Sequence, residues 1–63
     1  MITKQTFEQL VSDFEYEVID SWTDGLNEIR WSPEDETCIQ YSAGEEVRTG
    51  SFERLLQYFV DAE

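Results

Sequence analysis

Hydrophobic residues recur every three or four positions near the start of the chain, which is the spacing of one face of an α-helix. The apolar members of this stripe are Phe7, Leu10, Val11 and Phe14. Polar residues occupy the positions between them, and the Thr3 hydroxyl can accept a hydrogen bond from a free backbone N–H of the first turn. The pattern therefore predicts a helix from Lys4 to about Glu15.

The segment after this helix admits two interpretations. Val18 and Trp22 continue the helical spacing, so one long helix ending at Gly25 is an alternative. We favour a strand over Tyr16–Trp22, because its apolar residues are β-favouring types. The dipeptide Asp24-Gly25 that follows can supply the positive φ angles of a tight type I′ hairpin turn.

Alternation of polar and apolar residues predicts two further strands. The first is Leu26–Trp31, which puts two hydrophobic and two charged side chains on opposite faces and which Pro33 closes, since proline cannot donate to a ladder. The second is Thr37–Ser42, which has one half-buried face. Turns at Ser32–Glu36 and Ala43–Glu46 follow these two strands.

The end of the chain carries the clearest helical pattern. Its apolar stripe is Phe52, Leu55, Leu56, Phe59 and Val60. Ser51 can cap this helix, and Val47–Thr49 adds at most a short edge segment before it. We therefore expect an α+β fold in which a helix, an antiparallel meander of about three strands and a second helix follow one another. Both helices pack on one face of the sheet, and residues 1–63 form a single small acidic domain.

Composition makes a folded core plausible in so short a chain. A 63-residue domain hides only about 60% of the surface of its unfolded chain. Two Trp, three Tyr and four Phe offset this, since each ring can bury roughly 150–250 Å². The single cysteine, Cys38, cannot form an intramolecular disulfide, which favours a reducing compartment. With no leader pattern and no long apolar run, we expect a cytoplasmic protein that is not in a membrane.

The residue inventory argues against catalysis and against a cofactor. The chain has no His to act as a general base, and we therefore expect Cys38 to be a buried or half-buried structural thiol. Zinc lacks ligands, single glycines form no phosphate-binding loop, and Glu34–Glu36 lacks the alternate spacing of a calcium loop. We expect no enzyme, no cofactor and no metal site.

Charge is the strongest signal: fifteen Asp and Glu stand against four Lys and Arg, a formal net charge of −11. Such a chain is repelled by nucleic acid and by anionic membranes, so we expect a basic protein surface as partner. The acidic residues in or beside the predicted turns are the candidate partner-binding residues: Asp20, Asp24, Glu34, Asp35, Glu36, Glu45 and Glu46. Alternate turns of a meander project from opposite ends, so we expect Asp24 to share an end with Glu45 and Glu46.

Two functions of different kinds fit these features. The first is a phage- or mobile-element-type inhibitor that mimics nucleic-acid charge and blocks a basic nucleic-acid-binding protein. A domain about 28 Å across spans about 16 phosphate charges of duplex DNA, close to its fifteen carboxylates. The likeness to such inhibitors lies in size and charge, and no motif carries it.

The alternative is a homodimeric or adaptor-like interaction module whose acidic surface only confers solubility. The aromatic residues bear on both functions. The five Trp and Tyr side chains exceed what so small a core encloses, and an exposed ring beside carboxylates would anchor an interface.

Overall fold

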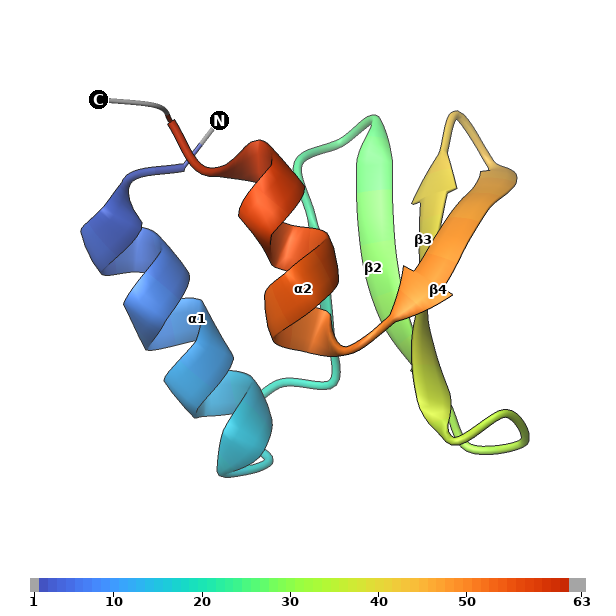
Figure 1. Cartoon of the computed structure of the whole chain (residues 1–63), viewed down its shortest axis with the longest axis horizontal. Helices are drawn as coiled ribbons and strands as arrows, with labels where there is room; N and C mark the ends of the chain where they lie inside the picture. Colours follow the sequence, from blue (N-terminus) through green and yellow to red (C-terminus); the bar gives the residue numbers. More distant parts are fainter. Residues whose placement is uncertain (1, 62–63) are drawn as a thin grey trace.

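The computed structural model describes residues 2–61 and shows an α+β fold (Figure 1). Its elements in chain order are α1 (Lys4–Glu15), β1 (Ser21–Thr23), β2 (Asn27–Ser32), β3 (Thr37–Ser42), β4 (Glu45–Gly50), α2 (Phe52–Leu56) and the 3-10 turn η1 (Gln57–Phe59). The strands form one antiparallel sheet in the order β1-β2-β3-β4. The α+β class is thus confirmed, whereas the sheet has four strands rather than the expected three.

The additional strand is β4, which is longer than the edge segment predicted from the sequence. Glu45 and Glu46 belong to it and lie opposite Ser42 and Tyr41 of β3. Backbone pairing across this hairpin outweighs the low strand propensity of glutamate. One register shift occurs along the pairing and leaves Val47 without a partner, so β4 is an edge strand with a β-bulge.

The face of the sheet toward α2 carries the hydrophobic core. Ile29 of β2 is fully buried and lies opposite Gln40 of β3. The buried apolar residues are Ile29, Cys38, Phe52, Leu55, Leu56 and Phe59. Gln40 is the buried polar residue, and its Oε1 accepts a hydrogen bond from Arg48 at 3.3 Å. The expectation that Cys38 is a buried thiol is confirmed.

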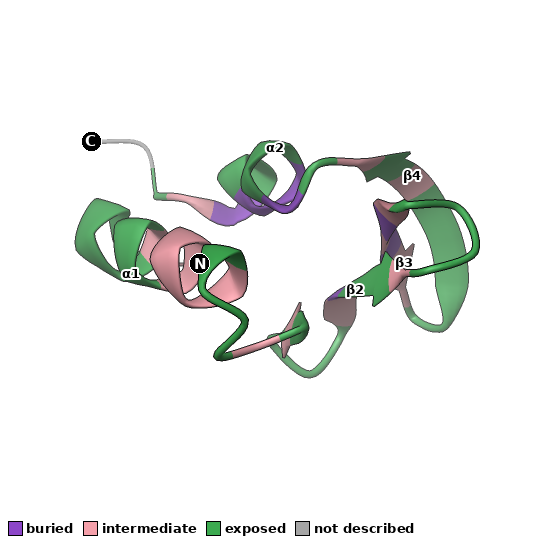
Figure 2. Ribbon diagram, turned by 90° about the horizontal axis from the view of Figure 1, so that it is seen from below, coloured by how far each residue is buried: buried purple, intermediate pink, exposed green. Residues whose placement is uncertain are grey.

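The two helices differ in how they meet the sheet. The shorter helix, α2, lies against β2, β3 and β4, and its buried side is turned toward the strands (Figure 2). The longer helix, α1, packs against α2 and extends the helical layer beyond it (Figures 1 and 2). The predicted packing of both helices on one face is therefore matched only in part. Within residues 2–61 neither helix has the length and apolar composition needed to cross a bilayer.

The link between α1 and β1 corrects the predicted strand over Tyr16–Trp22. The backbone N–H groups after α1 turn back to the helix: Val18 N donates to Asp13 O at 2.8 Å and Glu17 N to Phe14 O at 3.2 Å. This is the Schellman pattern, with Glu17 in the left-handed position at φ 62°. Because these groups are used by the helix end, they cannot join a ladder, and β1 begins only at Ser21.

The hairpin turns also differ from the prediction. A type I′ turn needs positive φ at both central residues. Between the paired Thr23 and Glu28, only Gly25 has positive φ, so Asp24-Gly25 does not form this turn. Ala43 and Gly44 do, with φ of 52° and 84°, and they directly join the paired ends of β3 and β4. The type I′ turn therefore joins β3 and β4, two hairpins later than the sequence predicts.

The final apolar stripe is helical up to Phe59, and Val60 then leaves it. Ser51 caps α2 as predicted, accepting from Arg54 N at 3.1 Å. Val60 instead pairs with Ile2 in a parallel bridge, and Ile2 N donates to Phe59 O at 2.9 Å. This bridge ties the start of α1 to the end of η1.

Candidate functional site

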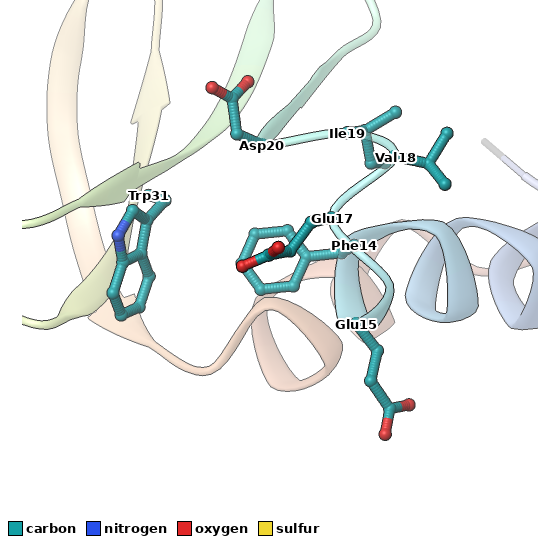
Figure 3. A pocket seen from close by; sticks show the side chains of 7 residues that line it. All are labelled: Phe14, Glu15, Glu17, Val18, Ile19, Asp20 and Trp31. Carbon is teal, nitrogen blue, oxygen red and sulfur yellow. The ribbon is translucent and has the colours of Figure 1, made fainter.

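An open depression of about 610 Å³ lies where α1 ends and β2 approaches its last residues (Figure 3). It is lined by Phe14, Glu15, Glu17, Val18, Ile19, Asp20 and Trp31. We call this the acidic aromatic depression, because two aromatic rings and three carboxylates contribute to it. Its lining comes from the helix end, from the turn that follows, and from β2.

Core packing holds the aromatic rings of the depression in place. The Phe14 ring stacks on the buried Phe52 ring, with centroids 4.4 Å apart and an angle of 2° between the planes. Trp31 meets Phe14 edge to face at 6.4 Å and remains 43% exposed. Such ring pairs stabilise the fold by more than the burial of their surface area alone. The indole is thus supported from one side and open to solvent on the other.

The backbone of the helix end positions the carboxylates. Glu17 occupies the left-handed position of the Schellman turn, and Asp20 is placed beside β2 because Trp31 N donates to Asp20 O at 3.2 Å. Figure 3 shows the Glu17 side chain extending toward the side of the depression where Trp31 lies, whereas Glu15 points away. A non-glycine residue in this conformation costs about 1–2 kcal/mol. The strain thus falls on a residue that lines the depression.

Among the residues that the structure describes, no basic side chain lines the depression. Within residues 2–61 the structure contains one ion pair, between Arg30 Nε and Glu28 Oε2 at 3.3 Å, and it lies elsewhere. In the same part of the chain, the carboxylates of Glu15, Glu17 and Asp20 have neither an ion-pair nor a hydrogen-bond partner. The depression therefore concentrates negative charge beside an open indole without internal compensation.

A second depression, of about 470 Å³, shows the contrast. It lies on the sheet face away from α2, and Arg30, Glu28 and Tyr41 are among its lining residues. Arg30 pairs with Glu28 and lies 5.8 Å from the Tyr41 ring centroid. Arg30 is thus already a cationic partner for both the Glu28 carboxylate and the Tyr41 ring.

The predicted site residues separate into two groups at opposite ends of the sheet. Asp20 lies next to Trp31, at the end where β2 passes into β3, and the turn at that end carries Glu34, Asp35 and Glu36. Asp35 accepts a hydrogen bond from Ser32 Oγ at 3.1 Å. We call this the β2–β3 end of the sheet. It holds four of the predicted residues and adjoins the depression.

The other end of the sheet holds the remaining three. Ala43 N donates to Leu26 O at 3.0 Å, which brings the β1–β2 and β3–β4 turns together, as predicted. Asp24 lies in the first turn, and Glu45 and Glu46 begin β4 after the second. This is the β1–β2 end of the sheet.

The Asp24 carboxylate is occupied within its own turn. Its Oδ1 accepts from Asn27 N at 2.7 Å and from Leu26 N at 3.0 Å, and its Oδ2 accepts from Asn27 Nδ2 at 3.1 Å. Hydrogen bonds from Asn27 and Leu26 lower the pKa of Asp24, because they stabilise the ionised form. This carboxylate shapes the hairpin, and binding a partner would compete with that role.

Sequence reasoning placed Asp20 among the site residues but missed its neighbours. In the sequence, Glu15 ends the predicted helix, Glu17 falls in the predicted strand Tyr16–Trp22, and Trp31 shares the apolar side of its strand with Ile29. The available signal was the general one, that more aromatic rings are present than the core encloses. Only the tertiary packing of α1 against α2 and β2 shows which ring is open and which acids surround it.

The described residues include no group of three or more Cys, Asp or Glu side chains arranged to hold a metal ion. Burial raises the pKa of the Cys38 thiol, which keeps it protonated and unreactive. Comparison of the chain with protein-family models, with curated proteins and with solved structures gives no match.

Proposed function

We propose that this chain is a small, non-catalytic acidic binding protein that occupies a basic surface of a nucleic-acid-binding protein. In this role its carboxylates replace the phosphate groups of the nucleic acid. One observation carries the proposal. The carboxylates that line the depression around the exposed Trp31 ring have no ion pair with a basic residue among residues 2–61. A cytoplasmic location, with Cys38 reduced, belongs to the same proposal.

The charge and size of the chain support mimicry of a short nucleic-acid segment. The molecule measures 34 Å along its longest axis, over which duplex DNA carries about 20 phosphate charges. The chain has fifteen acidic residues to compare with these phosphate charges. The β2–β3 end of the sheet and the acidic aromatic depression provide six of them: Glu15, Glu17, Asp20, Glu34, Asp35 and Glu36. An acidic surface of this kind speeds encounter with a basic groove and selects against acidic partners.

A hexa-arginine peptide provides a defined probe of this proposal. Calorimetric titration should show binding at about 20 mM salt that weakens at least tenfold at about 300 mM, because exposed charges are screened within a shorter Debye length. The protein should also release a labelled 16-base-pair DNA duplex from the same peptide. A neutral Gly-Ser peptide of equal length is the control. Binding that is absent at low salt, or unchanged by salt, would refute the proposal.

A homodimeric or adaptor-like module remains the second candidate, and exposed apolar side chains favour it. Tyr16, Val18 and Leu26 are 76%, 69% and 63% exposed. A dimer that covered them would remove apolar surface from water. Sedimentation equilibrium distinguishes the two functions: a stable dimer supports the module, whereas a monomer at about 100 μM protein supports the acidic inhibitor.

A further inference from the structure

We propose that the acidic aromatic depression is a socket for one arginine side chain of the basic partner. This inference deepens the proposed function and rests on it. The guanidinium would lie against the open side of the Trp31 indole and pair with the Glu17 carboxylate, while Asp20 adds negative charge at the rim. The depression would then be the centre of the interface, and the carboxylates of the β2–β3 turn would surround it.

The aromatic part of the socket has internal precedents. Arg48 lies 4.0 Å from the Tyr58 ring centroid, and Arg30 lies 5.8 Å from that of Tyr41. Trp31 has no such cation among residues 2–61. Indole is the strongest cation-binding ring among the side chains. Of the two indoles, Trp22 packs on Phe59, whereas Trp31 is the one that is exposed.

Charge complementarity identifies the occupant as a cation. Three carboxylates line the depression with no basic residue among them, so a bound cation would relieve their mutual repulsion. A second copy of the chain is a poor source of that cation. Each copy carries a net charge of −11, and two of its three arginines, Arg30 and Arg48, already contact Tyr rings of their own chain.

Arginine fits this combination of groups better than lysine. Its planar guanidinium stacks on an aromatic face, and the same group can donate two parallel hydrogen bonds to a carboxylate. It is also less strongly hydrated than an ammonium group, so it loses less on leaving water. The Trp31 indole and the Glu17 carboxylate that extends toward it offer both contacts at one place.

The first test uses a single side chain as probe. The full chain, labelled with ¹⁵N, is titrated with N-acetyl-arginine N-methylamide and, separately, with its lysine and citrulline analogues. We expect the arginine probe to shift the Trp31 indole N–H and the Glu17 and Asp20 amide signals. The lysine probe should bind at least threefold more weakly, and the neutral citrulline probe should leave these signals in place. Trp22 packs on Phe59 at 5.1 Å between ring centroids and serves as the internal control.

The second test compares two double variants against hexa-arginine. Glu17→Gln with Asp20→Asn removes two charges from the socket, and Asp35→Asn with Glu36→Gln removes two from the β2–β3 turn. Each pair contains one glutamate with left-handed backbone, at φ 62° and 52°, so the conformational changes are matched. We expect at least a tenfold loss of affinity from the socket pair and at most a twofold loss from the turn pair, with unchanged circular dichroism for both.

The outcomes separate the socket from the proposed function. If both pairs lose the same affinity while the parent chain binds the peptide with salt sensitivity, binding is diffuse: the socket is refuted and the proposed function stands. If the parent chain binds no basic peptide, both fall. If the Trp31 signal shifts on dilution of the protein alone, a second copy occupies the depression and the socket is likewise refuted.

Discussion

The two ends of the sheet carry acidic residues of similar number, and the aspartates Asp24 and Asp20 at these ends differ in how far their oxygens are already used. At the β1–β2 end, the Asp24 carboxylate accepts three hydrogen bonds within its own turn. Next to the β2–β3 end, the carboxylates of Glu17 and Asp20 have no partner among the described side chains, and Glu17 extends toward the exposed Trp31 indole. The count of carboxylates along the sequence does not distinguish these cases. An acidic residue therefore indicates a binding surface only where the fold leaves its carboxylate oxygens without partners.

The ends also differ in what their strained residues do. Glu17 near the depression and Ala43 in the type I′ turn both have left-handed backbone without being glycine. Ala43 serves only to reverse the chain, whereas Glu17 also brings a carboxylate to the depression. Substitutions at the two ends should therefore separate effects on stability from effects on binding.

The largest effect is expected from removing the ring that supports the depression. Phe52→Ala should lower the free energy of unfolding by about 3–5 kcal/mol, because it empties a core site and removes the stack under Phe14. That loss approaches the whole stability of a small domain, about 5 kcal/mol at the low end. Urea denaturation followed by tryptophan fluorescence measures it. The matched control is Tyr16→Ala, whose side chain is 76% exposed and should cost far less; equal losses would contradict this account of the core.

A smaller effect should separate two aspartates of equal charge. Asp24→Ala should lower the urea midpoint, since it removes three hydrogen bonds that order the β1–β2 turn. Asp20→Ala should leave the midpoint nearly unchanged, because the Asp20 carboxylate has no such bonds among residues 2–61. A midpoint that falls equally in both variants would erase the contrast between the two ends of the sheet.

The contribution of Asp24 should also depend on pH. Its pKa in the folded chain lies below the ordinary 3.8, so its stabilising effect is fully present above that value. The effect should be lost as the pH falls through the lowered pKa, where the folded chain takes up the proton. The difference in midpoint between the parent chain and Asp24→Ala should therefore be constant above about pH 5 and shrink below 3.8. A difference that grows on acidification would contradict the assigned hydrogen bonds.

The smallest effects should come from glycine at the two strained positions. Relief of left-handed strain gains about 1–2 kcal/mol, and the added freedom of glycine in the unfolded chain costs about 0.5–1 kcal/mol. Glu17→Gly and Ala43→Gly should therefore each raise the free energy of unfolding by roughly 0.5–1 kcal/mol. Calorimetry gives the stability, and hexa-arginine titration should show weaker binding for Glu17→Gly alone. Equal affinities in the two variants would count against a role for Glu17.

Much of the fold could be predicted because local pattern and tertiary structure agree. The limits of α1 and of β3 match the prediction. The apolar stripe of α1 is partly buried against the core, and β3 buries alternate residues, Cys38 and Gln40. The link from α1 to β1 could not be predicted, because its Schellman turn has glutamate where glycine is the usual signal. The type I′ turn was misplaced for a related reason: Ala43-Gly44 is a weaker signal than Asp24-Gly25.

The candidate site was harder to predict than the fold. Asp20 was identified because acids beside turns are visible in the sequence. Trp31 has the same strand pattern as the buried Ile29, and its partial exposure follows from its place near the end of β2, past the cover of α2. Which acids neighbour it depends on how α1 packs, and that packing joins residues far apart in the chain.

The bulge in β4 affects whether another chain can add to this edge of the sheet. An open strand edge invites other chains to add to it and so to grow fibrils. Here the unpaired Val47 interrupts the regular row of amides, and the adjacent Glu45 and Glu46 would repel an identical strand. We therefore expect the bulge and these two glutamates to disfavour the addition of a further strand at the β4 edge.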